Sequence, residues 1–466
     1  MKNASIKKAI LLYVIYLFLS SILFILLFPF LWIYTKITNK EKFFFQRIGF
    51  HSRFQKLKNY SSPTIWIHAV SVGEVGVARS LINAIEELSP QKITFILSTT
   101  TSKGHEFALQ SLGDKAICIY APFDFILSIF NSLKFFKPNF LVILETEIWP
   151  TWIVMAHKMK IKTAIINGRI SEKSFQRYKK IYPLISWLLE KIHVFSMIDN
   201  ENGNRLNSLG IGYNKIHINS NAKFDLYLSQ IKPLKQQHIQ SKIKKILKIN
   251  DMNKVFVAGS TRTGEEEIIL ESFLKCCDSS ILLIIAPRHV ERVPQIINYF
   301  NSKKISYSLF SNCKKNGRDI KNNIVLVDTI GDLMSIYSIA SLVFCGASLV
   351  PLGGQNILEP AAWGKPVMYG PYMDDFLEAK TFLENKKACI PLKNKKELFE
   401  KTKYYLNNIN EAKEIGIRAK KALELKAGSA KKHAEIIMIP YRLQDKNFGR
   451  SEGAIKKRLA TDLYKI

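Results

Sequence analysis

The chain has 466 residues, of which 47% are hydrophobic and 11% aromatic, a composition that excludes a disordered chain. Its length exceeds what one compact core usually holds and indicates two or three folded units. The formal net charge of +30 favours a polyanionic partner such as nucleic acid, anionic lipid or a phosphorylated substrate, although a general enrichment in lysine accounts for part of the excess.

The first feature along the chain is an uncharged stretch from Ala9 to Tyr34. As a helix it would reach roughly 39 Å, which is more than the ~30 Å hydrocarbon thickness of a bilayer. No small-residue cleavage site of a signal peptide follows it. Residues 1–40 are therefore predicted to form a single N-terminal membrane anchor.

Basic residues flank this stretch on both sides and are more numerous after it. The positive-inside bias then predicts that the rest of the chain lies in the cytoplasm. A helix that dips into one leaflet is the alternative to a helix that spans the membrane. In both cases the remaining chain is held at an anionic membrane surface.

After the anchor, short β-branched runs alternate with amphipathic stretches such as 76–88 and 149–160. This alternation is typical of a parallel sheet covered by helices on both faces. The predicted strands of the first half are 64–70, 92–98, 116–120, 139–145, 162–168, 193–198 and 215–220.

Residues 228–253 are rich in Lys and Gln and interrupt the strand pattern, which then restarts with runs at 254–260, 280–286, 323–328, 341–348 and 365–370. The predicted fold is α/β, with two Rossmann-like domains that face a cleft. Ligands of such sheets bind beyond the carboxyl ends of the strands, so the residues after these runs carry the information about function. The predicted parts are the anchor at 1–40, domains at 41–228 and 229–446, and a basic tail at 447–466.

The six cysteines form no Cys-x-x-Cys pair and no metal-binding spacing. The adjacent pair Cys276 and Cys277 is poorly placed for a disulfide or for joint metal binding. Reduced thiols in the folded cores are the prediction, in agreement with a cytosolic catalytic portion.

Ser71-Val-Gly-Glu74 directly follows the first predicted strand and begins a helix. Gly73 permits a tight turn, and Ser71 can cap the helix. Glu74 has two interpretations. The helix dipole, worth roughly 0.3–1 kcal/mol, favours a charged capping carboxylate. Burial, which can raise a carboxylate pKa by up to ~3–5 units, favours a general base that deprotonates an acceptor hydroxyl.

Two further candidate groups follow strands of the first half. Glu145 ends the run at 139–145 and Glu147 lies two residues later, and one of them is expected to face the site while the other caps the next helix. Lys223 follows the run at 215–220, where it suits a phosphate or carboxylate, although a surface role is equally compatible with its position.

In the second half, Pro287-Arg288-His289 follows a strand, and Arg288 can form bidentate bonds to a phosphate. Gly331-Asp-Leu333 begins a predicted helix, where plain capping is the alternative. Gly353-Gly354 lets the backbone approach a ligand, and Glu359, about one turn later, can bind ribose hydroxyls.

Several common motifs are absent from the sequence: a Walker A loop, Gly-x-Gly-x-x-Gly after a strand, His-Glu-x-x-His and an Asp-x-Asp metal pair. A donor phosphate must then be neutralised by Arg, Lys and helix dipoles. No recognised nucleic-acid motif or aromatic-interleaved basic patch is present either, so no nucleic-acid partner is expected.

Together these motifs resemble the family of 3-deoxy-D-manno-octulosonic acid (Kdo) transferases of lipopolysaccharide synthesis. The resemblance covers nearly the whole chain, through SVGE, ETEIWP, NGRIS, NAKFD, AGSTRTGEE, APRH, GDL and GGQNILEPAAWGKPV in that order. It implies the two-domain fold called GT-B, CMP-Kdo as donor, a lipid A precursor as acceptor, a location at the cell inner membrane, and no metal or other cofactor.

The resemblance also assigns roles to individual residues. It makes Glu74 the base that activates the acceptor hydroxyl and gives Glu145 and Lys223 a role in the transition state. Two positions depart from the family pattern: Gly331-Asp-Leu333 where Gly-Glu-Leu is frequent, and Gln355 where histidine is common. The CMP pocket would be lined by Pro287, Arg288, Gly331, Asp332, Leu333, Asn356, Ile357, Leu358 and Glu359.

Two other functions remain open from the sequence. One is a GT-B transferase that uses a UDP-sugar and another lipid acceptor, which would share the fold and the glycine-rich turn. The other is a non-catalytic basic protein of the membrane surface, or a nucleic-acid binder, for which Glu74 would have no chemical role.

Overall fold

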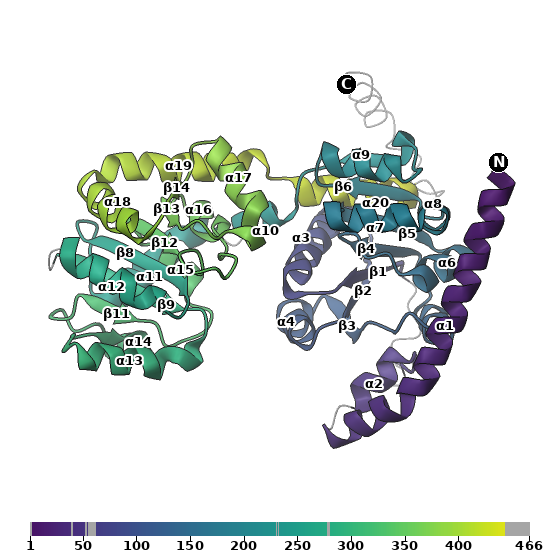
Figure 1. Cartoon of the computed structure of the whole chain (residues 1–466), viewed down its shortest axis with the longest axis horizontal. Helices are drawn as coiled ribbons and strands as arrows, with labels where there is room; N and C mark the ends of the chain where they lie inside the picture. Colours follow the sequence, from purple (N-terminus) through teal and green to yellow (C-terminus); the bar gives the residue numbers. More distant parts are fainter. Residues whose placement is uncertain are drawn as a thin grey trace. The chain divides into compact units, whose positions relative to one another are not determined.

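The computed structural model describes residues 2–38, 41–51, 54, 62–229, 231, 233–276 and 280–442. Two compact units are formed by Met1–Leu226 together with the chain from Gly428 onward, and by Tyr227–Ala427. Within the described residues, each unit is built on a parallel seven-stranded sheet with helices packed on it (Figure 1). This is the predicted α/β class with two Rossmann-like domains.

The sheet of the first unit has the strand order β3-β2-β1-β4-β5-β6-β7. The order reverses between β1 and β4, which pair with each other in parallel. Such a reversal opens a crevice at the carboxyl ends of the two strands, where ligands of doubly wound sheets bind. Its strands are β1 (Thr64–Ala69), β2 (Thr94–Thr99), β3 (Ala116–Tyr120), β4 (Phe140–Leu144), β5 (Lys162–Gly168), β6 (Val194–Met197) and β7 (Ile216–Ile218).

Helices of the first unit connect successive strands. The predicted helix at 76–88 begins four residues earlier, directly after Ser71, and the predicted helix at 149–160 is slightly shorter. These helices are α3 (Val72–Leu88), α4 (Ser102–Leu112), α5 (Ile126–Phe136), α6 (Pro150–Lys158), α7 (Glu172–Lys180), α8 (Tyr182–Leu189) and α9 (Asn200–Ser208), with a 3-10 turn η2 (Tyr213–Lys215). Helix α10 (Lys223–Ser229) begins in the first unit and ends in the second.

The second unit repeats the plan with the order β10-β11-β9-β8-β12-β13-β14. Here the order reverses between β8 and β12, which again pair in parallel. Its strands are β8 (Lys254–Thr261), β9 (Ile281–Pro287), β10 (Ser308–Leu309), β11 (Ile324–Leu326), β12 (Leu342–Cys345), β13 (Val367–Tyr369) and β14 (Ile390–Pro391).

The segment expected to join the domains is helical, because α11 fills most of it. The helices of the second unit begin with α11, and the rest lie between its strands or after the last one. They are α11 (Pro233–Leu247), α12 (Glu265–Cys276), α13 (Val293–Ser302), α14 (Phe310–Asn316), α15 (Leu333–Tyr337), α16 (Leu358–Ala362), α17 (Leu377–Asn385), α18 (Lys395–Asn407) and α19 (Ile409–Leu425), with 3-10 turns η3 (Val290–Arg292) and η4 (Asp374–Phe376).

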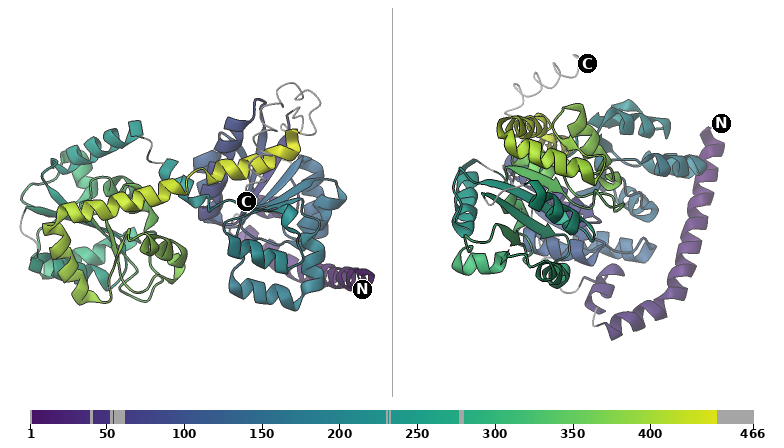
Figure 2. Two further views of the ribbon diagram at one scale, coloured as in Figure 1. Left: turned by 90° about the horizontal axis from the view of Figure 1, so that it is seen from above. Right: turned by 60° about the vertical axis from the view of Figure 1, so that its left-hand side comes forward.

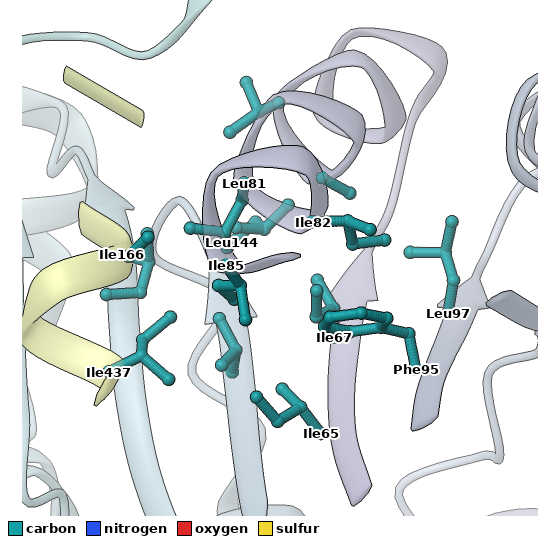
Figure 3. Close-up of a cluster of buried hydrophobic side chains, with 14 of the residues drawn as sticks. Ile65, Ile67, Leu81, Ile82, Ile85, Phe95, Leu97, Leu144, Ile166 and Ile437 are labelled. Atoms are coloured by element: carbon teal, nitrogen blue, oxygen red, sulfur yellow. The ribbon is translucent and has the colours of Figure 1, made fainter. Parts of the chain in front are cut away.

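The structure differs from the predicted domain boundaries at the C-terminal end. Residues 428–442 were expected in the second domain, but helix α20 (Ser429–Arg442) packs on α3, β5 and β6 of the first unit. Ile437 of α20 lies in the same apolar cluster as Ile85 and Ile166 (Figure 3). The physical reason is that the buried face of α20 completes a core that the first 226 residues leave open. The predicted tail at 447–466 lies outside the described residues.

Helix α1 (Lys2–Ile37) contains the uncharged stretch and continues through Pro29. Of the described helices, it is the one long and apolar enough to cross a membrane, over Ser5–Ile37. The helix runs along one side of the first unit, where it contacts α8 and the short helix α2 (Glu41–Arg47) (Figures 1 and 2).

The thiols of Cys118, Cys313 and Cys345 are free and buried, as predicted. The thiol of Cys389 is also free and is half-buried. The side chain of Cys276 and all of Cys277 lie outside the described residues.

Candidate active site

The carboxylate of Glu74 lies in the first turn of α3, at the carboxyl end of β1, and its side chain is only 7% exposed. The backbone N–H of Val70 donates to Glu74 Oε2 at 2.8 Å, and Ser71 Oγ donates to Glu74 Oε1 at 3.0 Å. Ser71 is the N-cap residue of α3, but its hydroxyl binds this carboxylate and makes no side-chain cap bond. The expected capping role of Ser71 is therefore replaced by an orienting contact to Glu74.

Burial raises the pKa of Glu74 from its ordinary value of 4.5 to about 7. The hydrogen bond from Val70 opposes this shift, whereas the negative charges of Glu145 and Glu147 add to it. A carboxyl group with this pKa exchanges its proton near neutral pH, and this is the property that a general base requires. Glu74 thus accepts a backbone N–H at the start of α3 and has a raised pKa, and its role as a general base stays a prediction.

Glu145 follows β4, the strand next to β1, and takes the left-handed backbone conformation with φ of 54°. Lys223 Nζ, at the start of α10, donates to Glu145 Oε1 at 2.7 Å. Lys223 also passes close to Gly73, since a Cβ added there would lie 3.9 Å from its Cε. The structure therefore brings Glu74, Glu145 and Lys223, the predicted catalytic residues, into one cluster at the reversal point of the first sheet.

Glu147 also belongs to this cluster, and burial raises the pKa of its carboxyl group, with a further contribution from Glu145. The expectation that one of the two glutamates caps the next helix is wrong. The N–H groups of Thr151 and Trp152, at the start of α6, bind Asp124 at 3.3 and 3.1 Å. Asp124 lies between α5 and its preceding strand and carried no motif that could have revealed it.

In the second unit, Arg288 follows β9 and is exposed, and its backbone N–H donates to Thr261 O at 3.0 Å. Glu359 lies in α16, and its carboxylate accepts a hydrogen bond of 3.1 Å from Asn356 Nδ2. Burial raises the pKa of Glu359, while the hydrogen bond from Asn356 and the positive charge of Arg288 oppose the shift. Arg288, Asn356 and Glu359 thus form an electrostatically connected group.

The sequence missed Tyr227, whose phenol hydrogen-bonds with Asn356 and lies close enough to Glu359 for their charges to interact. Burial raises the pKa of Tyr227 to about 12, so this group stays protonated at neutral pH. It is a hydrogen-bonding residue beside the predicted donor site, but a lone tyrosine in a helix gives no signal in sequence.

Gly331 precedes α15 with φ of +90°, and a Cβ added there would meet no atom within 4 Å. Asp332 turns its side chain toward α14, where Lys314 Nζ donates to it at 2.6 Å. Lys314 and Asp332 border a cavity of about 820 Å³ whose wall also carries Lys242, Lys245 and Lys248. The Gly331 turn therefore offers open space above its backbone, next to a strongly basic wall.

The predicted CMP-lining residues fall into two groups by burial. Arg288, Asp332 and Asn356 expose polar side chains at least in part. Pro287, Ile357 and Leu358 are buried. Leu333 is half-buried at the start of α15.

The glycine-rich turn before α16 is held by another residue that the sequence missed. Glu265 is fully buried and accepts the backbone N–H groups of Ala347, Ser348 and Leu349 at 2.6, 2.9 and 3.0 Å. These amides lie just beyond β12, between that strand and Gly353. Glu265 therefore fixes the start of the loop that carries the predicted donor residues.

The part of the chain that the structure describes contains no group of three or more His, Cys, Asp or Glu side chains that could hold a metal ion.

Two Rossmann-like units, each with a parallel seven-stranded sheet in the described residues, give a fold of the GT-B type. The chain belongs to the family of 3-deoxy-D-manno-octulosonic acid transferases. Residues 42–226 match the family model described as 3-Deoxy-D-manno-octulosonic-acid transferase (kdotransferase). A 3-deoxy-D-manno-octulosonic acid transferase of Haemophilus influenzae is 30% identical over 79% of this chain and 84% of its own length.

Another relative, the 3-deoxy-D-manno-octulosonic acid transferase of Rickettsia prowazekii, is 31% identical over 80% of this chain and 78% of its own length. A bifunctional glycosyltransferase/methyltransferase of Fusobacterium nucleatum is 35% identical over 75% of this chain, which spans only about half (54%) of that protein. Among solved structures, a UDP-GlcNAc 2-epimerase from Neisseria meningitidis has a TM-score of 0.54 at 16% identity, over 82% of this chain and 100% of the other, and shows the shared fold alone.

Proposed function

We propose that this chain transfers Kdo from CMP-Kdo to a lipid A precursor, lipid IVA, with Glu74 as the general base. The observation that carries the proposal is the position of Glu74: a buried carboxyl group with a pKa of about 7, beside Glu145 and Lys223, at the reversal point of the first sheet. Membership of the Kdo transferase family supports the transferred sugar.

The proposed reaction is a single displacement with inversion. The bond between the anomeric carbon of Kdo and the phosphate oxygen of CMP breaks, and the electron pair leaves with CMP. The acceptor hydroxyl oxygen forms the new bond to the anomeric carbon, and its proton passes to Glu74. Because the leaving phosphate is already a weak base, no strong acid is needed at this end of the reaction.

Charge develops on the sugar as CMP departs, since the anomeric carbon takes on oxocarbenium character. In the proposal, Glu145 and Lys223 act on this transition state as an ion pair of 2.7 Å. Lys223 suits the carboxylate that Kdo carries beside its anomeric carbon, and Glu145 holds the lysine in place.

For the donor, the proposal assigns the phosphate to Arg288 and the ribose hydroxyls to Glu359, which Asn356 orients through its 3.1 Å hydrogen bond. Gly331 leaves its backbone accessible to the nucleotide. The buried residues Pro287, Ile357 and Leu358 would contribute their backbone groups, with Asp332 and Leu333 at the start of α15 completing the CMP pocket.

The proposed acceptor is an anionic, bisphosphorylated lipid, which the net charge of +30 on the protein would attract. The proposal places the protein at the cell inner membrane, held by α1, with both units on the cytoplasmic side.

The decisive experiment incubates the purified full chain with CMP-Kdo and lipid IVA in detergent and measures the mass of the lipid. We expect a lipid heavier by one or more Kdo residues, and the mass gained counts them. A lipid of unchanged mass, with a family enzyme active in a parallel reaction, would contradict the proposal.

The donor nucleotide is tested separately by competition. We expect CMP to inhibit the reaction at lower concentration than UDP, and Arg288→Ala to weaken CMP inhibition at least tenfold. Preference for UDP would contradict CMP-Kdo as the donor but would still be compatible with a glycosyltransferase.

A further inference from the structure

One face of helix α1 is packed against the folded part of the first unit. Residues that are buried or half-buried recur along it at intervals of three and four, the spacing of one helix face. They are Ala9, Leu12, Tyr13, Tyr16, Leu17, Ser20, Ser21 and Phe24.

The contacts of this face are specific. The ring of Tyr13 packs at 5.5 Å from that of Trp187 in α8, within a cluster that includes Leu184 and Leu188. Phe24 stacks on Phe125 with ring centroids 4.6 Å apart. From Tyr13 to Phe24 the packed stretch is about 17 Å long, at 1.5 Å per residue. It is therefore docked side-on along about half the thickness of a hydrocarbon core.

A polar contact lies in the middle of the docked face. The hydroxyl of Tyr16 donates to the carboxylate of Asp124. Asp124 also accepts the two N–H groups at the start of α6. This carboxylate belongs to residues 121–125, which have no regular secondary structure.

The opposite face of α1 is apolar and open. Leu11, Phe18 and Ile25 follow one another at seven-residue intervals, which puts them on one side of the helix, and they are 59, 65 and 66% exposed. No charged residue lies between Lys8 and Lys36. The exposed apolar surface continues on α5, where Leu127 is 58% exposed.

A docked face on one side of α1 and an open apolar face on the other are difficult to combine with a helix that crosses the bilayer. If α1 crossed the bilayer, the irregular segment at 121–125 and the ionisable Asp124 would be carried to membrane depth with it. Charged groups beside the docked face would go with them, because Glu190 at the end of α8 is exposed and Lys191 Nζ lies 3.6 Å from the ring centroid of Trp187. A charged side chain that faces lipid is strongly unfavourable. A helix lying in the membrane plane keeps the same contacts, because its docked face then points to the headgroups and its open face to the acyl chains.

We propose that α1 does not span the membrane but lies along one leaflet, with its Leu11–Phe18–Ile25 face among the acyl chains and the first unit resting on the headgroups. The partner is an anionic lipid leaflet. Lys7, Lys8 and Lys36 are exposed at the two ends of the apolar face, where they meet the headgroup phosphates. Both ends of the chain then lie on the same side of the membrane.

The first test is topology, read on the full chain with an epitope tag at either terminus. We expect external protease to remove both tags in inverted inner-membrane vesicles and neither tag in intact spheroplasts. Removal of the N-terminal tag alone from spheroplasts means that α1 spans the membrane and overturns the inference.

The second test is depth. A fluorophore is attached to the cysteine of each of three variants, Leu11→Cys, Phe18→Cys and Ile25→Cys. In anionic vesicles, lipids with spin labels at known depths quench the fluorophore and so report its depth. The unsubstituted chain, labelled in the same way, corrects for labelling of native cysteines. A helix in the plane gives three equal depths. An upright helix separates positions 11 and 18 by about 10 Å in depth, at 1.5 Å per residue, and would refute the proposal.

A matched pair of variants separates the two faces of the helix. We expect Phe18→Asn with Ile25→Asn on the open face to weaken vesicle binding at least tenfold and leave the melting temperature of the protein unchanged. Tyr16→Phe on the docked face should lower the melting temperature and leave vesicle binding unchanged. Vesicle binding and melting temperature are both measured without substrate, so their outcome is independent of the proposed transferase activity.

Discussion

The environment of Glu74 sets both its chemistry and its effect on stability. Burial raises its pKa to about 7 in the folded protein, while the unfolded chain titrates near 4.5. Between these values the folded state holds a proton that the unfolded state has released. The contribution to stability is therefore complete below pH 4.5 and falls as the pH rises through 7.

The first prediction is the pH dependence of transfer. Because the base must be unprotonated, kcat/KM should rise with pH and level off above an apparent pKa of about 7. Glu74→Gln should lower kcat by roughly 10²–10⁴-fold and remove this limb of the profile. Glu87→Gln, an exposed position on the same helix, should leave rate and profile unchanged. A limb that survives in Glu74→Gln would assign the base elsewhere.

The second prediction concerns stability at the same position. Gln keeps an acceptor for Val70 N–H and carries no charge, so Glu74→Gln removes the cost of ionising a buried carboxyl group. The unfolding free energy of the natural chain should fall relative to the variant by about 3 kcal/mol between pH 4.5 and 8. Urea denaturation at several pH values measures this difference. Parallel curves for the two proteins would show that Glu74 titrates normally.

The third prediction uses the ion pair beside Glu74. Lys223 neutralises Glu145, and the negative charge of Glu145 raises the pKa of Glu74. Lys223→Met should therefore move the kcat/KM limb to higher pH, and Glu145→Gln should move it to lower pH. Shifts of the same sign in both variants would contradict an electrostatic link between this pair and the base. Both variants should also reduce kcat, since the proposed mechanism assigns both residues to the reacting sugar.

At the level of single residues, the sequence pointed to candidate site residues that follow predicted strands. It missed carboxylates that bind backbone N–H groups of other segments. Glu74, Glu145 and Lys223 each come directly after a β-run, so the strand pattern alone brought them to one edge of the sheet. Asp124 and Glu265 bind N–H groups of distant segments. A carboxylate of that kind gives no local signal, because its partners are chosen by the tertiary fold.

At the level of elements, every run of β-branched residues that the sequence predicted as a strand contains one. The parallel arrangement also follows, because buried parallel strands are apolar on both faces. The sequence missed β10 and β14, which are two residues long and too short to show a period. Helix boundaries moved by up to four residues, as at α3, since capping contacts rather than periodicity decide them.

The fourth prediction concerns the loop that Glu265 holds. Glu265→Ala leaves the buried N–H groups of Ala347, Ser348 and Leu349 without an acceptor, so it should destabilise the chain by about 3 kcal/mol or more. It should also raise the KM for the donor, because Asn356 and Glu359 lie beyond this loop. Glu267→Ala, exposed on the same helix, should change stability by no more than about 0.5 kcal/mol. A normal KM in Glu265→Ala would show that the loop does not position the donor site.

At the scale of the whole molecule, the chain passes between the two units twice. It leaves the first unit at Leu226 and returns at Gly428. Asp225 holds the returning segment, because its carboxylate accepts the N–H groups of Gly428 and Ala430 at 2.6 and 2.7 Å. His433 of α20 then hydrogen-bonds Ser196 at 2.7 Å. Sequence order could not reveal this return, since α20 reads as a simple continuation of the helices before it.

The last prediction follows from this topology. The second unit, Tyr227–Ala427, is one continuous segment with its own core, so it should fold when produced alone and bind CMP. The segment 1–226 lacks α20, whose Ile437 is fully buried in the cluster of Ile85 and Ile166, so alone it should aggregate or unfold at lower denaturant. Adding residues 428–442 through a short linker should restore cooperative unfolding.

Within the full chain, Ile437→Ala should lower the free energy of unfolding by about 2–5 kcal/mol, whereas Glu435→Ala, exposed on the same helix, should change it little. A stable, cooperative 1–226 fragment would show that α20 is an accessory to the first unit and not a part of its core.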